Sequence, residues 1–380
     1  MPCKTSIFAA TNTDPLLLGG CLLHVAVFEF LCSSGSYSDS GRAGPYASLL
    51  DEGAAMLLSL ASDLDRCGHH VSVALETSIR AAWKMQSLKS SVLDRVDVHD
   101  VHPMPEPDIE PIADLWASIA LASHCAIVIA PELDGLLSRI VQAMRQRGCR
   151  IMSADNLFLC TASDKWDTYQ HWTKHQQITA PTMLANQWLE YPSSIGSISY
   201  PSDGWVLKRR FGAGGTDMQR FDSSEILCDR IATLSNPLDW IVQPWIIGQP
   251  ASLAVVGPWD SSGKIPVAAI GPTEQLFKDG SYIGGQGPLA VDPKKLDRFA
   301  QGLLMSIPGA TDGWVGIDFL ILPTGQWIPL EINPRLTSSY LGYRKLYGPE
   351  LANTILGEPL PNIQLPIPGA FRFSVSDFHG

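Results

Sequence analysis

The stretch that decides the fold reads GIDFLILPTGQWIPLEINPR and spans residues 316–335. Two largely apolar runs flank the turn sequence Pro-Thr-Gly-Gln, a pattern that predicts an antiparallel β-hairpin. If those four residues form the turn, Leu322 faces Trp327, and Asp318 then lies directly opposite Glu331. The hairpin therefore predicts that two carboxylates from different strands meet inside apolar surroundings.

The same face of this hairpin gathers oxygen atoms. Because side chains alternate along a strand, Glu331 and Asn333 share one face, while the residue between them points toward the core. With Asp318, these hard oxygen ligands suit Mg²⁺, with Mn²⁺ as a second option, and no Cys or His favours zinc. The alternative is that the carboxylates are solvated and pair with Arg335 or Arg344, although apolar neighbours make unpaired carboxylates costly there.

A glycine-rich loop follows a second predicted strand. Residues 204–208 form a short apolar run that ends in Lys208, and the sequence FGAGGT follows at residues 211–216. Backbone N–H groups of such a loop can face phosphate oxygens, because glycine has no Cβ to hold the phosphate away. Lys208 would supply positive charge. The alternative is a glycine hairpin beside an ordinary surface lysine.

The composition is that of a folded, acidic protein with more than one domain. The chain has 380 residues, and 27 Lys and Arg against 38 Asp and Glu give a formal net charge of −11. This acidity argues against a nucleic acid or an anionic membrane as the main partner. Eight scattered cysteines without a Cys-x-x-Cys pair predict a reducing, cytoplasmic location. The apolar stretch at residues 16–31 is interrupted by His24 and Glu29 and is too short for a membrane span.

The N-terminal part alternates short apolar runs with amphipathic segments. Strands are predicted at residues 23–28, 71–75, 95–98 and 126–130, and helices at residues 45–66, 112–122 and 136–147. This order predicts an open parallel sheet with helices on both faces, whose ligands bind beyond the carboxyl ends of the strands. Residues 29–41 and 131–135 then lie in the ligand zone. No Gly-x-Gly-x-x-Gly follows the first strand, which disfavours a nicotinamide dehydrogenase.

Three further segments complete the prediction from the residues. Ser163 is expected to cap a helix at residues 164–176. Residues 1–22 are expected to form a loose extension, and the Pro-rich residues 359–380 an extended tail on the surface.

Several motifs, in this order, resemble the ATP-grasp superfamily over residues 155–345. They are Lys165 in Ser-Asp-Lys-Trp, Lys208 before the glycine loop, WIVQPWI at residues 240–246, Asp318, and Glu-Ile-Asn-Pro-Arg at residues 331–335. The resemblance implies an N-terminal open parallel α/β (pre-ATP-grasp) domain followed by a two-subdomain ATP-grasp fold. The expected boundaries are 1–22 for the extension, 23–155 for the first domain, 156–238 for the small subdomain, 239–350 for the large subdomain and 351–380 for the tail.

The resemblance also implies roles for individual residues. Lys165 and Lys208 would contact ATP phosphates, and the loop with Gly212, Gly214, Gly215 and Thr216 would close over them. The segment with Gln243, Trp245 and Ile246 would be a hinge strand that reads the adenine edge, with Ile317 or Leu330 beneath the ring. Asp318, Glu331 and Asn333 would hold magnesium, and Arg335 would face the transferred phosphoryl group. One departure from the family pattern is Gln249. Many members have Glu near this place, where its carboxylate often points toward the ribose. An amide oxygen can still accept a hydrogen bond there, but a weaker one than a charged carboxylate accepts.

The implied reaction is phosphoryl transfer from ATP to a carboxylate, followed by attack of an amine on the acyl phosphate to form an amide. Catalysis would come from positioning and from electrostatic stabilisation by Mg²⁺, the lysines and Arg335, with Lys208 and Arg335 as the catalytic pair. The expected partners are small-molecule carboxylate and amine substrates, and a homodimer is left open.

One branch of the superfamily, the tyramine–glutamate ligases of methanofuran biosynthesis and their relatives in C1-metabolising bacteria, is similar at further points. These are VFEF at residues 27–30, SSG at 33–35, DEG at 51–53, APE at 130–132, QPW at 243–245 and YIGG at 282–285 with Pro288. This likeness implies glutamate and tyramine, or a tyrosine-like amine, as substrates in C1-carrier cofactor biosynthesis. Tyr282, Gly284 and Gly285 would form a loop lining the acceptor pocket. Ser338, Ser339 and Arg344 would hold substrate carboxylates, unless they are only a helix start with a surface arginine.

Two other functions stay open at this point. An ATP-grasp enzyme could use an acceptor that is not an amine, as a kinase or a thiol-forming ligase does, because the metal site handles only the phosphoryl half of the reaction. A nucleotide-binding protein without turnover is the other alternative, in which Gln249 would signal loss of activity.

Overall fold

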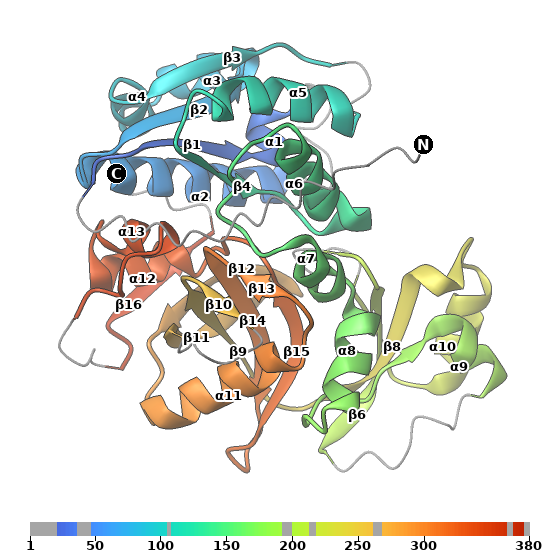
Figure 1. Ribbon diagram of the computed structural model, residues 1–380. Helices are drawn as coiled ribbons and strands as arrows, with labels where there is room; N and C mark the ends of the chain where they lie inside the picture. Colours follow the sequence, from blue (N-terminus) through green and yellow to red (C-terminus); the bar gives the residue numbers. More distant parts are fainter. Residues whose placement is uncertain are drawn as a thin grey trace, which may run out of the picture.

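The computed structural model describes residues 21–35, 47–104, 108–191, 200–212, 218–260, 268–362 and 368–375. Three parts follow one another in space (Figure 1). A blue and teal α/β unit lies at the top, a six-stranded sheet with its helices lies below it, and a smaller green and yellow unit lies to one side.

The N-terminal unit is a parallel sheet of strand order β3-β2-β1-β4. Its strands are β1 (His24–Glu29), β2 (His70–Glu76), β3 (Asp97–Val101) and β4 (Cys125–Ile129). Its helices are α1 (Phe30–Ser33), α2 (Ala47–Arg66), α3 (Thr77–Lys84), α4 (Ser87–Leu93), α5 (Ile109–Ala120) and α6 (Leu136–Gln146), with a 3₁₀ turn η2 (Leu133–Gly135). The predicted open parallel sheet is confirmed, although α3 and α4 were not predicted.

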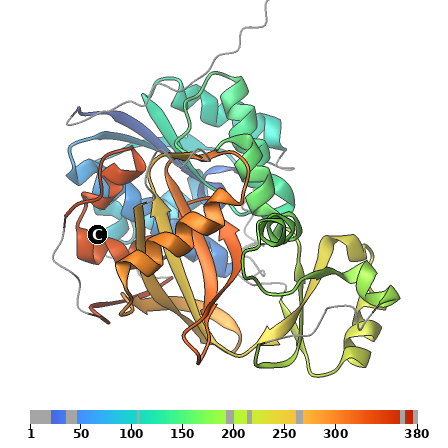
Figure 2. The same ribbon diagram turned by 60° about the horizontal axis from the view of Figure 1, so that its bottom comes forward.

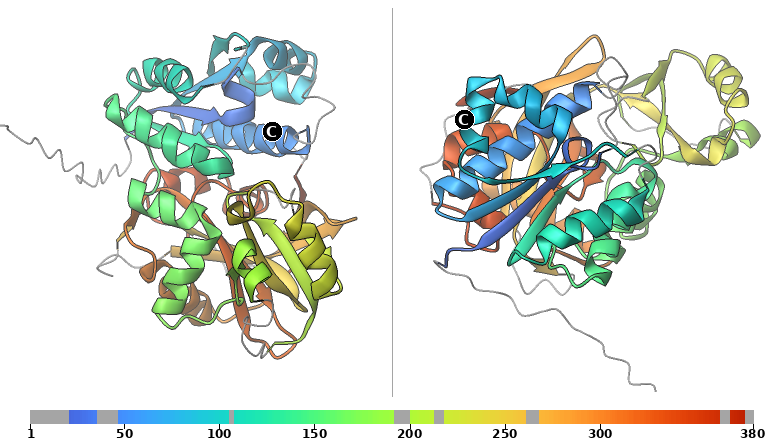
Figure 3. Two further views of the ribbon diagram at one scale, coloured as in Figure 1. Left: turned by 90° about the vertical axis from the view of Figure 1, so that its right-hand side faces the viewer. Right: turned by 90° about the horizontal axis from the view of Figure 1, so that it is seen from above.

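Alternation along the buried strands explains why this sheet has helices on both faces (Figure 3). In β1, Val25 and Val27 belong to the core beneath α2, α3 and α4, whereas Ala26 and Phe28 belong to the core beneath α5 and α6. The phenyl ring of Phe28 stacks on Trp116 of α5 with centroids 4.9 Å apart. Burial of both faces fixes the direction in which the strand ends point.

The large sheet is antiparallel, with strand order β15-β14-β9-β11-β12-β16. Its strands are β9 (Gln249–Val256), β11 (Ala268–Lys278), β12 (Ser281–Gly287), β14 (Trp314–Ile321), β15 (Trp327–Asn333) and β16 (Phe371–Ser374). One face packs against α7 (Asn156–Ser163), α8 (Lys165–Lys174) and α11 (Pro293–Met305), and the other against α12 (Tyr340–Tyr347) and α13 (Leu351–Ile355). Strands β10 (Trp259–Asp260) and β13 (Ala310–Thr311) pair with each other in a short antiparallel two-stranded sheet.

The smaller unit stands away from the rest of the molecule (Figure 2). Its antiparallel sheet has the order β5-β8-β6-β7, with β5 (Met183–Leu184), β6 (Ser202–Arg209), β7 (Gln219–Phe221) and β8 (Trp240–Ile246). Helices α9 (Ala185–Glu190) and α10 (Ser224–Ala232) cover it, and a 3₁₀ turn η3 (Pro237–Asp239) leads into β8. A core of its own, centred on Trp188, Leu207 and Val242, holds this unit together.

The hairpin of β14 and β15 confirms the pairing of Asp318 with Glu331. Nearer the turn the register differs from the prediction, because Trp327 pairs with Ile321 and not with Leu322. The extra residue, Leu330, is accommodated in a bulge just before Glu331. The predicted turn geometry was therefore wrong by one residue, and the bulge restores the predicted register at the carboxylates.

Two other local predictions were wrong. Helix α8 is capped by Asp164, whose carboxylate accepts hydrogen bonds from the backbone N–H groups of the first turn, while Ser163 ends α7. The C-terminal region is not merely an extended tail, because α13 and β16 lie within it. Phe371 and Phe373 of β16 are buried, so hydrophobic burial outweighs the high proline content of the neighbouring sequence.

Within the described residues, none of the helices combines the length and the apolar character that crossing a membrane requires. The predictions for Gly214, Gly215, Thr216 and residues 1–20 fall outside the described residues.

Candidate active site

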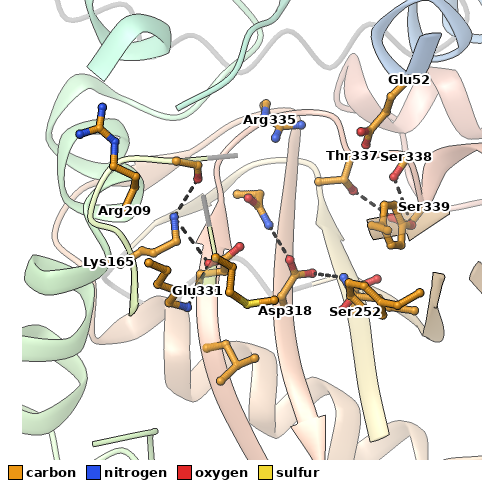
Figure 4. A pocket seen from close by; sticks show the side chains of 18 residues that line it. Glu52, Lys165, Arg209, Ser252, Asp318, Glu331, Arg335, Thr337, Ser338 and Ser339 are labelled. Atoms are coloured by element: carbon orange, nitrogen blue, oxygen red, sulfur yellow. Dashed lines mark hydrogen bonds and ion pairs between the residues drawn. The ribbon is translucent and has the colours of Figure 1, made fainter. Parts of the chain in front are cut away.

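A cavity of about 190 Å³ opens where the three parts of the molecule meet (Figure 4). Eleven residues named from the sequence line it: Lys165, Lys208, Gly212, Tyr282, Asp318, Leu330, Glu331, Asn333, Arg335, Ser338 and Ser339. They come from α8, β6 and the segment after it, β12, β14, β15 and the segment after β15. Residues that are far apart in sequence but belong to ordered motifs thus converge on one pocket.

Lys165 is the first residue of α8, and its position is fixed by a local network. Asp164, the helix cap before it, accepts hydrogen bonds from the Arg210 guanidinium at 2.6, 2.8 and 3.0 Å. The backbone N–H of Lys165 donates to the Arg210 carbonyl at 3.2 Å. Its ammonium donates to the Gly212 carbonyl at 2.7 Å, at the start of the glycine loop. The loop and the helix start are therefore joined through Lys165.

Two lysines face one carboxylate in the pocket, and Figure 4 shows one of them, Lys165, beside Glu331. The Nζ atoms of Lys165 and Lys208 lie 3.6 and 3.5 Å from the same Glu331 oxygen. Burial alone would raise the pKa of Glu331, but the two ammonium groups outweigh burial and hold that pKa below its usual value. Burial lowers the pKa of Lys208. Two positive charges in a half-closed cavity form a site that favours a polyanion.

Asp318 forms no direct ion pair among the described residues, although Arg335 and Lys208 are near enough to lower its pKa in part. Its carboxylate oxygens accept hydrogen bonds from the Gln275 and Asn333 amides, each at 3.0 Å. Burial, followed by repulsion from Glu331, raises the pKa of Asp318 to about 7. A divalent cation would relieve both effects, and Asp318, Glu331 and the amide oxygen of Asn333 form the all-oxygen donor set that Mg²⁺ prefers. These residues therefore fit a magnesium ion.

The guanidinium group of Arg335 is positioned by a carboxylate of the N-terminal unit. Its Nε and Nη2 atoms lie 2.9 and 3.1 Å from the two carboxylate oxygens of Glu132, which follows β4. Glu29, at the end of β1, is the second buried carboxylate at this sheet edge, only 3% exposed. Both belong to the segments predicted to lie in the ligand zone, and Arg335, which lines the pocket, contacts this edge of the sheet through Glu132.

The far end of the pocket carries hydroxyl groups and one further carboxylate. The Ser338 hydroxyl donates to the Tyr282 oxygen at 3.2 Å. Thr337 and Ser339 share a hydrogen bond of 2.9 Å. Glu52, on α2 of the N-terminal unit, points into this end from above (Figure 4). Burial raises the pKa of the Glu52 carboxyl.

Several lining residues were missed by the sequence analysis. They are Glu52, Arg209, Met218, Ser252, Gln275, Phe277 and Thr337. Glu52 stands in the Asp-Glu-Gly triplet that was noticed for its resemblance, and this triplet was the available signal for it. The others belong to no motif, and only the antiparallel pairing of β9 and β11 beside β14 brings Ser252 and Gln275 toward Asp318.

The predicted adenine-reading residues do not line this pocket. The Gln243 amide donates to the Thr182 hydroxyl at 2.7 Å, Trp245 lies beneath the Arg220 guanidinium, and Ile246 is buried in a local core. Gln249 lines a separate depression. Leu330 lines the pocket, whereas Ile317 is fully buried in the core.

Three predicted substrate residues need correction. Arg344 does not line the pocket, because its guanidinium binds the buried Asp63 carboxylate of α2, with Nε 2.7 Å from Oδ2. Gly284 and Gly285 lie in strand β12 and not in a loop. A Cβ at either position would overlap Phe373 of β16, so close strand packing accounts for both glycines. The arginine and the two glycines therefore have structural roles.

Comparison with known proteins agrees with this arrangement. Residues 162–339 match the ATP-grasp domain family. A protein from Archaeoglobus fulgidus described as an ATP-grasp superfamily protein is 19% identical, with 88% of this chain and 89% of that chain covered and a TM-score of 0.62. The family match is therefore confined to residues 162–339, and the likeness to solved structures shows that the chain has the same fold. No curated protein sequence matches this chain.

Two similar structures contain nucleotides. The biotin carboxylase domain of 2-oxoglutarate carboxylase from Hydrogenobacter thermophilus, a dimer in complex with MgADP and bicarbonate, is 13% identical (90% and 72% covered, TM-score 0.63). Carboxyaminoimidazole ribonucleotide synthase from Aspergillus clavatus, complexed with ATP, is 17% identical (92% and 78% covered, TM-score 0.58). At these identities the likeness shows the fold, and the reaction of this chain has to be argued from its own pocket.

Proposed function

We propose that this protein is an ATP-dependent ligase that joins a carboxylate to an amine. The observation that carries the proposal is the lysine–carboxylate cluster. Lys165 and Lys208 approach the same Glu331 oxygen, and Asp318 pairs with Glu331 across the hairpin. Two cations for phosphate oxygens beside an all-oxygen metal set are what phosphoryl transfer from ATP requires.

Each residue has a role in this proposal. Lys165 and Lys208 bind phosphate oxygens, and Gly212 begins the loop that closes over them, with Gly214, Gly215 and Thr216. Asp318, Glu331 and Asn333 would hold magnesium, which would neutralise charge on the phosphates. Arg335, fixed by Glu132, faces the group that receives the phosphoryl unit. The backbone of β8 near Gln243, Trp245 and Ile246 reads the adenine edge.

The chemistry follows from the charges in the pocket. A carboxylate oxygen is a poor leaving group, so transfer of the ATP γ-phosphoryl group to it creates an acyl phosphate with phosphate as the leaving group. The amine nitrogen attacks the acyl carbon, and the bond from that carbon to the phosphate oxygen breaks. The protein supplies no covalent nucleophile in this scheme, and its residues act by positioning and by stabilising charge.

For the substrates we propose glutamate and tyramine, or a tyrosine-like amine, in the biosynthesis of a C1-carrier cofactor. Support comes from the motifs shared with that branch and from Tyr282 and Ser338, which lie together at the far end of the pocket. We also propose the domain boundaries given above and leave a homodimer as a prediction.

The test is a screen for ADP release from the purified protein with Mg²⁺ and ATP. Amino acids are combined with amines, beginning with glutamate and tyramine or tyrosine, and the product is identified by mass spectrometry. ADP release that requires both substrates, with an amide of the summed composition less water, supports the ligase. Equal ADP release without any amine would favour a kinase-like reaction instead.

A further inference from the structure

Some of the carboxylates around the pocket have no ion-pair partner in the part of the chain that the structure describes. Three of its cations already have carboxylate partners: Lys165 and Lys208 share Glu331, and Arg335 pairs with Glu132. Two carboxylates that line the cavity, Asp318 and Glu52, form no ion pair with a lysine or arginine of the described chain. Both carboxylates are half-buried, and Arg335 attracts both without a direct contact, so each position favours a cationic ligand that would pair with it directly.

The two unpaired carboxylates lie at different ends. Asp318 lies beside Glu331 in the proposed metal site, which accounts for its cation. Glu52 lies at the opposite end, above Ser338 and Ser339 in Figure 4, on a helix of the N-terminal unit. A cation bound at Glu52 would therefore be distinct from the metal ion. It would be a charged group of the substrate that occupies this end of the pocket.

Glu52 is not needed to neutralise Arg335. The Arg335 guanidinium already contacts both oxygens of Glu132. Glu29 is also close by, since a Cβ on Gly53, the residue after Glu52, would overlap the Glu29 carboxylate. Glu29 is buried, with 3% of its surface exposed, and burial raises its pKa to about 7, so a proton can neutralise it. Of the three glutamates around Arg335, only Glu52 lines the cavity.

The groups beside Glu52 suit an ammonium group. The Ser338 hydroxyl reaches both the Tyr282 oxygen and the Glu52 carboxylate. Hydroxyl and carboxylate oxygens can accept the hydrogen bonds of an N–H donor. At the same end, Phe277 packs edge-to-face on Tyr282 with ring centroids 5.8 Å apart, and both line the pocket. An apolar body attached to the ammonium group would contact this aromatic pair.

We propose that Glu52 is the residue that recognises the ammonium group of the amine substrate and accepts its proton before attack. The inference rests on the proposed ligase function and names a residue for its second half-reaction. One proton passes from R–NH₃⁺ to the Glu52 carboxylate. The freed nitrogen lone pair forms the C–N bond, the C–O bond to phosphate breaks with its electron pair on the phosphate, and the second N–H proton leaves to solvent.

The electrostatic surroundings set the pH dependence. Burial raises the pKa of Glu52, and Glu132 raises it further, whereas Arg335 and the hydrogen bond from Ser338 lower it. Tyr282 faces the same carboxylate, and its own pKa is raised by burial. The ammonium group can form an ion pair with Glu52, and transfer a proton to it, only when the Glu52 carboxyl is ionised. Amine turnover in the wild-type protein should therefore decline on the acid side, as Glu52 becomes protonated.

The test compares Glu52→Gln with wild type, using glutamate and the amine that gives most ADP release in the screen, with tyramine tried first. The variant should raise KM for the amine at least about tenfold, as expected when a charge pair becomes neutral. KM for ATP should stay unchanged. The acid limb of kcat/KM for the amine should disappear. Glu52→Asp keeps the charge and should restore part of the amine affinity.

Hydroxylamine provides a second readout, because it is largely uncharged near neutral pH and traps the acyl phosphate as a hydroxamate. Hydroxamate formation should be the same in wild type and Glu52→Gln, while amide formation falls. Asp51→Asn is the matched control, since Asp51 is the exposed neighbour on the same helix and does not line the pocket. It should behave as wild type.

The outcomes separate the two proposals. If the wild-type protein ligates amines and Glu52→Gln keeps the wild-type KM for the amine and its acid limb, the role of Glu52 is wrong and the ligase stands. If both amide and hydroxamate formation fall equally in Glu52→Gln, the residue acts in the first half-reaction, which also overturns the inference. If no amine stimulates ADP release by wild type, the ligase itself fails.

Discussion

At one end of the pocket Lys165 and Lys208 face Glu331, and every charged group comes from residues after position 160. At the other end Glu52 reaches in from α2, and Arg335 is held by Glu132 after β4. At the first end Glu331 pairs with two lysines and Asp318 belongs to the proposed metal site, whereas the second end is completed by the N-terminal unit and contains Glu52, for which neither a metal nor an ion pair among the described residues accounts. On the proposed function, the phosphates of ATP would be bound by residues of the matched ATP-grasp segment, while the N-terminal unit would contribute to the choice of acceptor.

The largest expected effect concerns the contact between these regions. Arg344→Ala would leave the Asp63 carboxylate, 1% exposed, without its cation, at a cost of about 3–5 kcal/mol of unfolding free energy. Tyr340, which donates to the same carboxylate at 2.7 Å, cannot replace the charge. Urea unfolding measures the change, and Arg80→Ala, at an exposed ion pair with Asp100, is the control.

The folded fraction of Arg344→Ala should keep the wild-type KM for both substrates, because Arg344 does not line the pocket. A variant with wild-type stability and a raised KM for the carboxylate would restore the original prediction that Arg344 holds substrate.

The next effect tests the phosphate end. Glu331→Gln keeps the shape of the side chain but removes the charge that faces both lysines, so ADP formation should fall about 10²–10³-fold, the size typical of a lost electrostatic contact at a reacting group. The rate of ADP release and the circular dichroism spectrum are measured together. Wild-type ADP release from a folded Glu331→Gln protein would mean that the metal assignment is wrong.

A third prediction concerns pH at the N-terminal edge. Glu29 has a folded pKa of about 7 because burial disfavours its charged form, against a usual value of 4.5. The folded state therefore binds the proton more tightly, and the contribution of Glu29 to stability is lost as pH rises from about 4.5 to 7. Glu29→Gln should be more stable than wild type by about 2–3 kcal/mol at pH 8, with the difference vanishing near pH 4.

Unfolding in urea at both pH values checks this prediction. An equal stability difference at the two pH values would show that Glu29 does not change its protonation on unfolding. Glu110→Gln on the exposed start of α5 serves as a control carboxylate that should show little pH-dependent change.

The smallest effect should come from one phosphate-binding lysine. Lys208→Ala leaves Lys165 in place, so the dissociation constant for ATP should rise about tenfold, as expected for the loss of one charged contact. Isothermal titration calorimetry measures it, with Lys174→Ala at the far end of α8 as control. An unchanged constant would count against the phosphate-binding role of Lys208.

Sequence patterns were sufficient where the chemistry lies in short, regular segments. The predicted pairing of Asp318 with Glu331 is correct, although only because the bulge at Leu330 offsets a one-residue error in the predicted turn. The β–α order indicated the sheet edge with Glu29 and Glu132. The bulge at Leu330 could not be predicted, because one extra residue in a strand leaves no local pattern.

Other features depend on contacts that are distant in sequence. Glu52 enters the pocket only because α2 packs against α12 and α13, and the pairing of β12 with β16 turns the expected glycine loop into a strand. Arg344 resembled a substrate-binding residue until Asp63, far earlier in the chain, was placed beside it. Such long-range pairings are properties of the fold and not of any local motif.

The central claim is that the phosphoryl group of ATP is transferred to a carboxylate. It is tested most directly with glutamate labelled with ¹⁸O in its carboxyl groups, ATP and the amine, followed by ³¹P NMR of the released phosphate. An acyl phosphate leaves one substrate oxygen on phosphorus, so each phosphate formed should carry one ¹⁸O from the labelled position. Amide formation with unlabelled phosphate would contradict the account.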